Sequence, residues 1–449
     1  MKKRESYGIC AWLLLFSLLL GCAGPSLPLK TQAVRLDAEE QAALGYVKAT
    51  SYRAENVIAY EQEDGTTRLC LFSAPVEEGP LSLQGGESDA AFSCEAKFTD
   101  IAFPALLRAD APIHISTLGQ PIRIFPADQE EHAGRLMERT NAFGQKRQTV
   151  QYADLFGKGI HGYCTPTSFG VNIEAVLNER PEEDTLQLQV MLPPLFPDTG
   201  SPDYILMKND PTDGEVKSIL YTPLAVDHNG RWNYTNRIRL ADKDPASGLY
   251  TLEYTLDSAF LDDPNTEYPV TLHQSVYNYL SKQPDTSAYS LTGEIQGYYL
   301  SPYALLGDAT PKGEGWTYLR FEALNTLNIQ ADDILSAKYI FHNLFDLPEP
   351  AVVGAYAVTA DWCSINTRWY NRPTHDDKPV GLVSVQKQGD YELDITALLR
   401  EMIKSKGKEG AKYSVQNSFL IRCDTPGSNI LLASGDNGLY SPCLELIIK

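Results

Sequence analysis

The sequence predicts an all-β protein: tandem β-rich domains that end in a jelly-roll β-sandwich, with one short helix in the last domain. Apolar and polar residues alternate over many short stretches, as they do in half-buried strands. The chain has 25 tyrosines and only 5 methionines, which favours strands over helical bundles. At 449 residues it exceeds the size of about 250–300 residues at which a single core stops growing, so several domains are expected.

The first 45 residues predict export and attachment to a membrane. Residues 1–21 begin with basic side chains and continue into the apolar run 11–20, which is shorter than a bilayer span of about 20 residues and is typical of a signal peptide. Leu-Leu-Gly-Cys, ending at Cys22, resembles the lipobox of bacterial lipoproteins. The resemblance implies a diacylglyceryl group on Cys22, a lipidated tether over residues 22–45, and an exported protein anchored to the bacterial membrane, facing the extracellular or envelope side. The alternative is an ordinary secretory signal that contains an incidental cysteine.

Strand patterns divide the rest of the chain into an N-terminal β-rich region at residues 46–148, a second β-rich domain at 149–275 and a last domain at 290–449. In the first region, apolar runs on both sides of Asp64-Gly65 predict a hairpin over residues 54–72, because this dipeptide tolerates the positive φ of a tight turn. Alternating strand patterns recur through the second region. The sequence leaves open whether the first two regions form one domain or two.

Residues 290–449 contain nine short strand patterns at regular spacing, which is typical of a sandwich or jelly roll. One helix is predicted among them, with Thr396 as its N-cap and Gly407 at its end. Six ordered blocks of this region resemble the DNRLRE-type domain, whose relatives include polysaccharide-binding modules of jelly-roll fold. The motif residues that carry the resemblance are Trp362, Trp369, Asn371, Pro373, Asp394 and Thr396. The chain departs from the family at Cys363-Ser364, where relatives usually carry an acid, and at Tyr370, which replaces the first Asn of a pair.

Side chains of the same motif are the candidate ligand-binding residues. Tyr370, Arg368 and Arg372 are predicted to point outward, where an aromatic ring can stack on a sugar and a guanidinium group can bind a carboxylate. Arg368 and Arg372 would form a local basic face together with Lys338 and Arg422. The alternative is that these four charges are scattered and solvated.

The two tryptophans of the motif have two interpretations. Trp362 and Trp369 would suit stacking on sugar rings. Burial in the corner of the sandwich is favoured, because large aromatic side chains dominate protein cores.

The sequence predicts no catalytic residue, no metal site and no cofactor. The most enzyme-like cluster, His375-Asp376-Asp377, is interpreted as a turn, because a glycosidase needs two carboxylates that face each other across about 5–10 Å. Acidic turns would suit a structural Ca²⁺, but no EF-hand spacing occurs, and no G-x-S-x-G, H-E-x-x-H or Walker pattern is present. Among the six cysteines that follow Cys22, Cys423 and Cys443 are the pair to test for a disulfide, and the others are expected to be mostly reduced, buried thiols.

The charge and the resemblance together predict a function class. A formal net charge of −20 disfavours nucleic acid as a partner, because such a surface repels phosphate. The predicted function is that of a non-catalytic, lipid-anchored cell-envelope protein whose C-terminal sandwich binds polysaccharide, cell-wall glycan or another surface ligand. The alternatives are a purely structural envelope component and a polysaccharide-active enzyme with a dispersed site.

Overall fold

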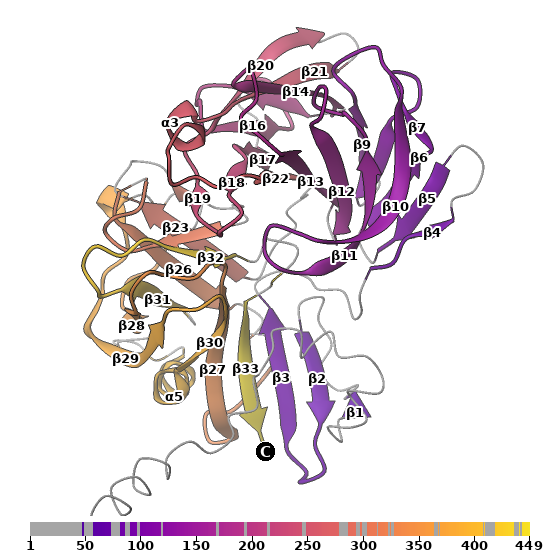
Figure 1. Cartoon of the computed structure of the whole chain (residues 1–449). Helices are drawn as coiled ribbons and strands as arrows, with labels where there is room; N and C mark the ends of the chain where they lie inside the picture. Colours follow the sequence, from indigo (N-terminus) through magenta and orange to yellow (C-terminus); the bar gives the residue numbers. More distant parts are fainter. Residues whose placement is uncertain are drawn as a thin grey trace, which may run out of the picture.

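The computed structural model describes two β-rich bodies (Figure 1). The described residues are 47–48, 57–72, 81–85, 90–96, 99–117, 120–167, 170–192, 195–212, 216–244, 248–277, 286–292, 297–298, 303–311, 313–321, 324, 327–362, 367, 369–406, 408, 418–434, 440 and 442–449. The predicted signal peptide, Cys22, the tether, Arg368 and Gly407 lie outside these residues. No helix among the described residues is long and apolar enough to cross a bilayer.

The first body, here called the N-body, comprises residues 81–277 and contains two eight-stranded antiparallel sheets. One sheet has the order β19 (Trp232–Asn233), β18 (Leu224–Val226), β22 (Val270–Tyr277), β13 (Gly170–Leu177), β12 (His161–Thr167), β11 (Lys146–Tyr152), β10 (His132–Thr140), β7 (Leu106–Leu107). The other has the order β20 (Arg237–Asp244), β21 (Leu249–Thr255), β14 (Thr185–Met191), β9 (Gln120–Phe125), β8 (Ile113–Thr117), β6 (Thr99–Pro104), β5 (Ala90–Glu95), β4 (Gln84–Gly85). A small third sheet contains β15 (Phe196–Asp198), β16 (Tyr204–Lys208) and β17 (Val216–Tyr221), and α3 (Ser258–Leu261) is a short helix.

The predicted boundary between residues 148 and 149 is wrong, because it falls inside strand β11. Val150 of β11 belongs to the same hydrophobic core as Ile101 of β6 and Leu188 of β14. Each sheet has one apolar face, and the two sheets bury these faces against each other. The strand patterns on the two sides of this boundary therefore belong to one core.

The second body, here called the sandwich, combines residues 47–48 and 57–72 with residues 286–449. Its first sheet has the order β1 (Val47–Lys48), β2 (Val57–Glu61), β3 (Thr67–Phe72), β33 (Cys443–Ile448), β27 (Ile334–Asn343), β32 (Ile430–Ala433), β25 (Tyr303–Leu306), with β30 (Gly389–Asp394) also paired to β27. Its second sheet has the order β24 (Gly297–Tyr298), β23 (Thr286–Thr292), β26 (Gly315–Phe321), β31 (Ser418–Cys423), β28 (Ala351–Val358), β29 (His375–Val385). The chain alternates between the two sheets, as in a jelly roll, and the predicted all-β sandwich is confirmed.

The predicted hairpin at Asp64-Gly65 is present, with Gly65 at φ +82° as its tight turn requires. It does not belong to an N-terminal domain, however. Strand β3 pairs along its whole length with the last strand of the chain, from Thr67 opposite Ile448 to Phe72 opposite Cys443. The chain therefore starts the sandwich, leaves it to form the N-body, and returns to complete it.

The predicted helix of the last domain is α5 (Thr396–Ser405), but Thr396 is its first residue and Ile395 is the N-cap. Asp394 accepts hydrogen bonds at Oδ1 from the backbone N–H of Thr396 (2.9 Å) and from its hydroxyl (2.6 Å). The Thr396 Oγ1 in turn accepts from the N–H of Ala337 on β27, at 2.9 Å. Both motif residues therefore fix the start of the helix to the sheet.

The tip of the β10–β11 hairpin joins the two bodies. Phe143 is 1% exposed and packs against Tyr303 and Phe345 of the sandwich, with ring centroids 6.1 and 5.9 Å apart. Its carbonyl oxygen accepts hydrogen bonds from Gln388 Nε2 (2.8 Å) and from the Tyr440 hydroxyl (3.0 Å). The bodies are thus held together by apolar packing and hydrogen bonds at this hairpin tip, and by the packing of Leu224, Val226 and Tyr234 of the N-body in the same apolar cluster.

Candidate functional site

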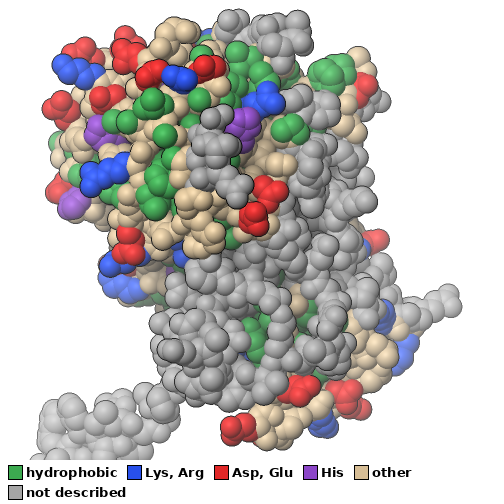
Figure 2. Space-filling model, turned by 90° about the vertical axis from the view of Figure 1, so that its right-hand side faces the viewer, with side chains coloured by type: hydrophobic (Ala, Val, Ile, Leu, Met, Phe, Trp, Pro, Cys, Tyr) green, Lys and Arg blue, Asp and Glu red, His purple; other side chains and the backbone are tan. Residues whose placement is uncertain are grey.

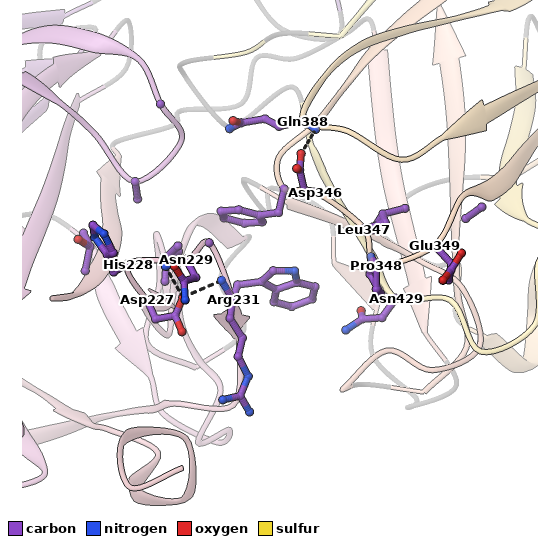
Figure 3. A pocket seen from close by; sticks show the side chains of 18 of the residues that line it. Asp227, His228, Asn229, Arg231, Asp346, Leu347, Pro348, Glu349, Gln388 and Asn429 are labelled. Carbon is purple, nitrogen blue, oxygen red and sulfur yellow. Dashed lines mark hydrogen bonds between the residues drawn. The ribbon is translucent and has the colours of Figure 1, made fainter. Parts of the chain in front are cut away.

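A cleft of about 1300 Å³ opens between the N-body and the sandwich, beside the Phe143 contact (Figure 3). The turn from Asp227 to Trp232, between β18 and β19, forms its N-body wall. The loop from Phe345 to Ala351 and the loop from Thr425 to Asn429 form its sandwich wall. Pockets between domains are a common location for ligand-binding sites.

Asp227 shapes the N-body wall. Its Oδ1 accepts the backbone N–H groups of Asn229 (3.0 Å) and Arg231 (2.8 Å), and its Oδ2 accepts the N–H of Glu267 at 3.3 Å. Gly230 has φ +80°, a backbone conformation that favours glycine. This 5% exposed carboxylate therefore holds the turn that presents the neighbouring side chains to the cleft.

The last two residues of this turn are Arg231, whose charge is paired, and Trp232, which supplies an aromatic ring. Arg231 pairs with Asp263 and donates from Nη1 to the Thr266 hydroxyl at 3.1 Å. Trp232 is half-buried and stacks on Phe345 of the sandwich, with centroids 6.3 Å apart and planes 23° apart. The cleft is thus lined by an aromatic pair to which each body contributes one ring.

The sandwich wall presents carboxylates and prolines. Asp346 accepts hydrogen bonds from Lys387 Nζ and from the N–H of Gln388, both at 2.7 Å, and the Lys387 hydrogen bond is the main cause that lowers the pKa of this carboxyl group. Glu349 is exposed between Pro348 and Pro350.

These contacts decide what the cleft can do chemically. Its lining contains three carboxylates, and two of them, Asp227 and Asp346, already accept hydrogen bonds from the chain. Among the lining carboxylates, Glu349 is the remaining one, and it is exposed. The cleft offers aromatic stacking and hydrogen bonding to a bound molecule. Within the described ranges, no three His, Cys, Asp or Glu side chains converge as a metal site would require.

The predicted motif residues lie elsewhere: Asp394 and Thr396 are at the start of α5 beside the first sheet, and Trp362, Trp369, Asn371 and Pro373 are on the outer side of the second sheet of the sandwich. Trp362 is 6% exposed and packs against Tyr318 at 5.8 Å, which confirms its predicted burial. Trp369 begins a single 3₁₀ turn, η2 (Trp369–Asn371), and is half-buried edge-on to Trp316 at 5.1 Å. The buried Pro373 accepts the Tyr318 hydroxyl at its carbonyl oxygen, at 3.0 Å.

The side chains predicted to point outward behave differently from one another. Tyr370 is 75% exposed, which confirms that its side chain points outward as predicted. Asn371 beside it is exposed as well. Arg372 does not extend freely into solvent. Its guanidinium lies 4.8 Å from the Trp316 ring and 4.4 Å from the Trp369 ring, and Nη1 donates to the Trp369 carbonyl at 2.8 Å. Cation–π attraction therefore holds the Arg372 guanidinium against the two tryptophan rings.

The predicted basic face forms only in part: the guanidinium groups of Arg372 and Arg422 lie 4.8 and 5.6 Å from the same Trp316 ring, Lys338 is elsewhere, and Arg368 lies outside the described residues. Lys338 lies on β27 in the first sheet and pairs with Glu392 at 2.6 Å. Arg422 lies on β31 in the second sheet, where it bonds Asp424 at 2.9 Å and stacks on Tyr356. Figure 2 shows a different side of the molecule, the one on the right in Figure 1, where basic and acidic side chains are interspersed.

Two smaller predictions also need correction. His375-Asp376-Asp377 is the start of strand β29 and not a turn. Cys423 lies on β31 of the second sheet and Cys443 on β33 of the first, so the suggested pair is divided between the two layers of the sandwich.

The fold and the cleft define an all-β protein of two bodies, with a jelly-roll-like sandwich and a cleft between the bodies. No family model and no curated protein matches this sequence. Solved structures that match include crystal structures of an exo-β-1,3-galactanase from Phanerochaete chrysosporium, two of variants with β-1,3-galactotriose and one with galactose. They are 7–10% identical, cover 89–90% of this chain and 83–95% of theirs, and have TM-scores of 0.11–0.12. Scores this low carry no argument about fold or activity.

Proposed function

We propose that this protein is an exported, lipid-anchored component of the bacterial envelope that binds polysaccharide without cleaving it, in the cleft between the N-body and the sandwich. The observation that carries the proposal is the Trp232–Phe345 pair, in which the two bodies each contribute an aromatic ring to a cleft of about 1300 Å³. Phe345 is 5% exposed and supports the half-buried Trp232 from below, so the Trp232 ring offers the accessible flat apolar area to the C–H faces of sugar rings, while neighbouring polar groups bond their hydroxyls.

The charges around the cleft favour a neutral glycan over an acidic one. Arg231 is paired with Asp263, and Asp346 is paired with Lys387. Glu349 adds an exposed negative charge that would repel a carboxylate or a sulfate. A neutral chain of hydroxylated rings meets no such repulsion.

Replacing Trp232 by alanine should weaken glycan binding by at least about tenfold, the range found for a buried aromatic contact at a binding site. The measurement is a titration of the full chain in detergent against the glycans it retains on an array of neutral and acidic bacterial polysaccharides. Tyr370→Ala is the matched control, because it removes the most exposed aromatic ring of the predicted motif and should change binding less than about twofold.

The outcomes separate the alternatives. Loss of binding in Tyr370→Ala with retention in Trp232→Ala would move the site to the η2 surface. No binding of the wild-type chain to any glycan would support a purely structural component. Release of reducing ends from a bound glycan would show an enzyme.

The lipid anchor is tested by replacing Cys22 with serine. Removing the thiol removes the only atom that a thioether-linked diacylglyceryl group could use at this position, so the variant should move from the membrane fraction to the soluble fraction. Mass spectrometry of the wild-type N-terminal peptide should show the added lipid. An unmodified Cys22 in mature protein would contradict the anchoring proposal.

A further inference from the structure

Two cysteines far apart in the sequence meet on the outer face of the first sheet of the sandwich. Strands β3 and β33 are adjacent and antiparallel, with Cys70 opposite Glu445 and Phe72 opposite Cys443. Residues two apart on a strand share a face, so Cys70 and Cys443 are diagonal neighbours on the same side of the sheet. They belong to one apolar cluster and are 0% and 2% exposed.

The pKa values of the two thiols are shifted in opposite directions. A hydrogen bond from the Cys443 thiol, followed by the charge of Arg68, lowers the pKa of Cys70, while burial and the charge of Glu445 oppose this shift. The Arg68 guanidinium is itself held by Glu445, with Nε 2.6 Å from Oε2. Cys70 is thus the more readily ionised of the pair, and the thiolate is the form that attacks a disulfide.

We propose that Cys70 and Cys443 form a disulfide in the exported protein, so that the first hairpin of the sandwich is bonded covalently to the last strand. The proposal rests on the export that is part of the proposed function, since disulfides persist in oxidising compartments. Diagonal neighbours on adjacent strands have Cα atoms about 7–8 Å apart, so the bond requires the backbone to move towards β3 at Cys443, which is the first residue of β33.

The chemistry is thiol–disulfide exchange with a donor disulfide, either of an oxidoreductase or of a small thiol compound. The Cys70 thiolate attacks one donor sulfur, forms a mixed disulfide and releases one donor thiolate. The Cys443 thiol loses its proton to solvent, attacks the sulfur of Cys70 and releases the second donor thiolate. Two protein thiols are oxidised and one donor disulfide is reduced to two thiols. Both sulfurs are buried in the folded protein, so the exchange takes place before β33 has closed against β3.

The position of this bond gives it a mechanical consequence. Residues 22–45 would connect the lipid to the β1–β2–β3 edge of the sheet, and β3 is the strand of that edge that pairs with β33. Tension on the anchor would otherwise be resisted by the hydrogen bonds and packing between β3 and β33. A Cys70–Cys443 bond transfers the tension to the body of the sandwich.

The test is peptide mapping of the full chain after export in a bacterial host, with free thiols blocked by N-ethylmaleimide before any reduction. A peptide pair that joins Cys70 to Cys443 is expected in the wild type and in Cys423→Ser, the matched control, and not in Cys443→Ser. Reduction should lower the Tm of the wild type by roughly 5–10 °C and leave the Tm of Cys443→Ser unchanged.

A second sample separates geometry from export. The same chain is unfolded, reduced and refolded in glutathione buffer, where the link should form without any cellular compartment. Absence of the link in this sample would overturn the disulfide and leave glycan binding unaffected. A link that forms here but not in cells would overturn the disulfide of the exported protein and would count against export itself.

Discussion

Replacing Phe143 by alanine is expected to lower the free energy of unfolding by about 3–5 kcal/mol, the range for truncating a fully buried phenylalanine. The side chain is 1% exposed and lies between the two bodies, so the cavity would open at their contact. Urea unfolding, followed by tryptophan fluorescence and by circular dichroism, measures the change. Phe196→Ala is the matched control, because Phe196 is 41% exposed and its truncation should cost less than about 0.5 kcal/mol.

The same variant links stability to the proposed function. Because the two rings of the cleft come from different bodies, Phe143→Ala should also weaken glycan binding, and its two bodies should unfold in separate transitions. Unchanged unfolding together with unchanged binding would show that the hairpin tip does not hold the bodies together.

Local sequence signals predicted local structure well. Asp64-Gly65 between two apolar runs predicted the first hairpin, because the turn residues and the alternation that form it are contiguous. The partner of that hairpin could not be predicted in the same way. Strand β3 pairs with β33, the last strand of the sequence. The apolar pattern of a hairpin does not indicate which distant strand will pair with its edge.

In the aromatic motif, the burial or exposure of single side chains could be predicted, but their contacts with residues outside the motif could not. Burial of Trp362 and exposure of Tyr370 followed from size and turn position. The position of Arg372 did not, because its guanidinium is held by Trp316, a residue of β26 that the motif does not include. A cation–π contact of this kind depends on the tertiary structure and leaves no spacing in the sequence.

The cleft was missed because segments far apart in the sequence build it, among them the β10–β11 hairpin, the turn at Asp227 and the loops near Glu349 and Asn429. The sequence Asp227-His-Asn-Gly signals a turn, and the prolines near Glu349 signal a loop. Neither signal indicates that these segments face each other (Figure 3), since their meeting depends on the docking of Phe143 against the sandwich. A half-buried tryptophan directly after such a turn, Trp232, was the one local sign of a binding surface.

A buried carboxylate lies directly beneath this docking contact. Glu174 on β13 accepts hydrogen bonds at Oε1 from His273 Nδ1 and from the N–H of Ala142, both at 2.9 Å, and its Oε2 pairs with Arg139. Burial opposes ionisation, but the hydrogen bond from His273 and the charge of Arg139 outweigh it and lower the pKa of Glu174 from 4.5 to about 2. The carboxylate thus fixes the base of the hairpin that carries Phe143.

Replacing Glu174 by glutamine should therefore cost about 3–5 kcal/mol at neutral pH, because Arg139 would keep a largely buried charge without its anion. The pKa is lower in the folded state than in the unfolded chain, so the unfolded state binds more protons between about pH 4.5 and about pH 2. The difference in unfolding free energy between wild type and variant should be full above pH 4.5 and should shrink as the pH falls towards 2.

Urea unfolding at a series of pH values measures this difference. Glu138→Gln on β10 is the control, since that carboxylate is exposed and should change stability by less than about 0.5 kcal/mol at any pH. A difference that stayed constant down to pH 2 would show that the ionised form of Glu174 is not what stabilises the contact.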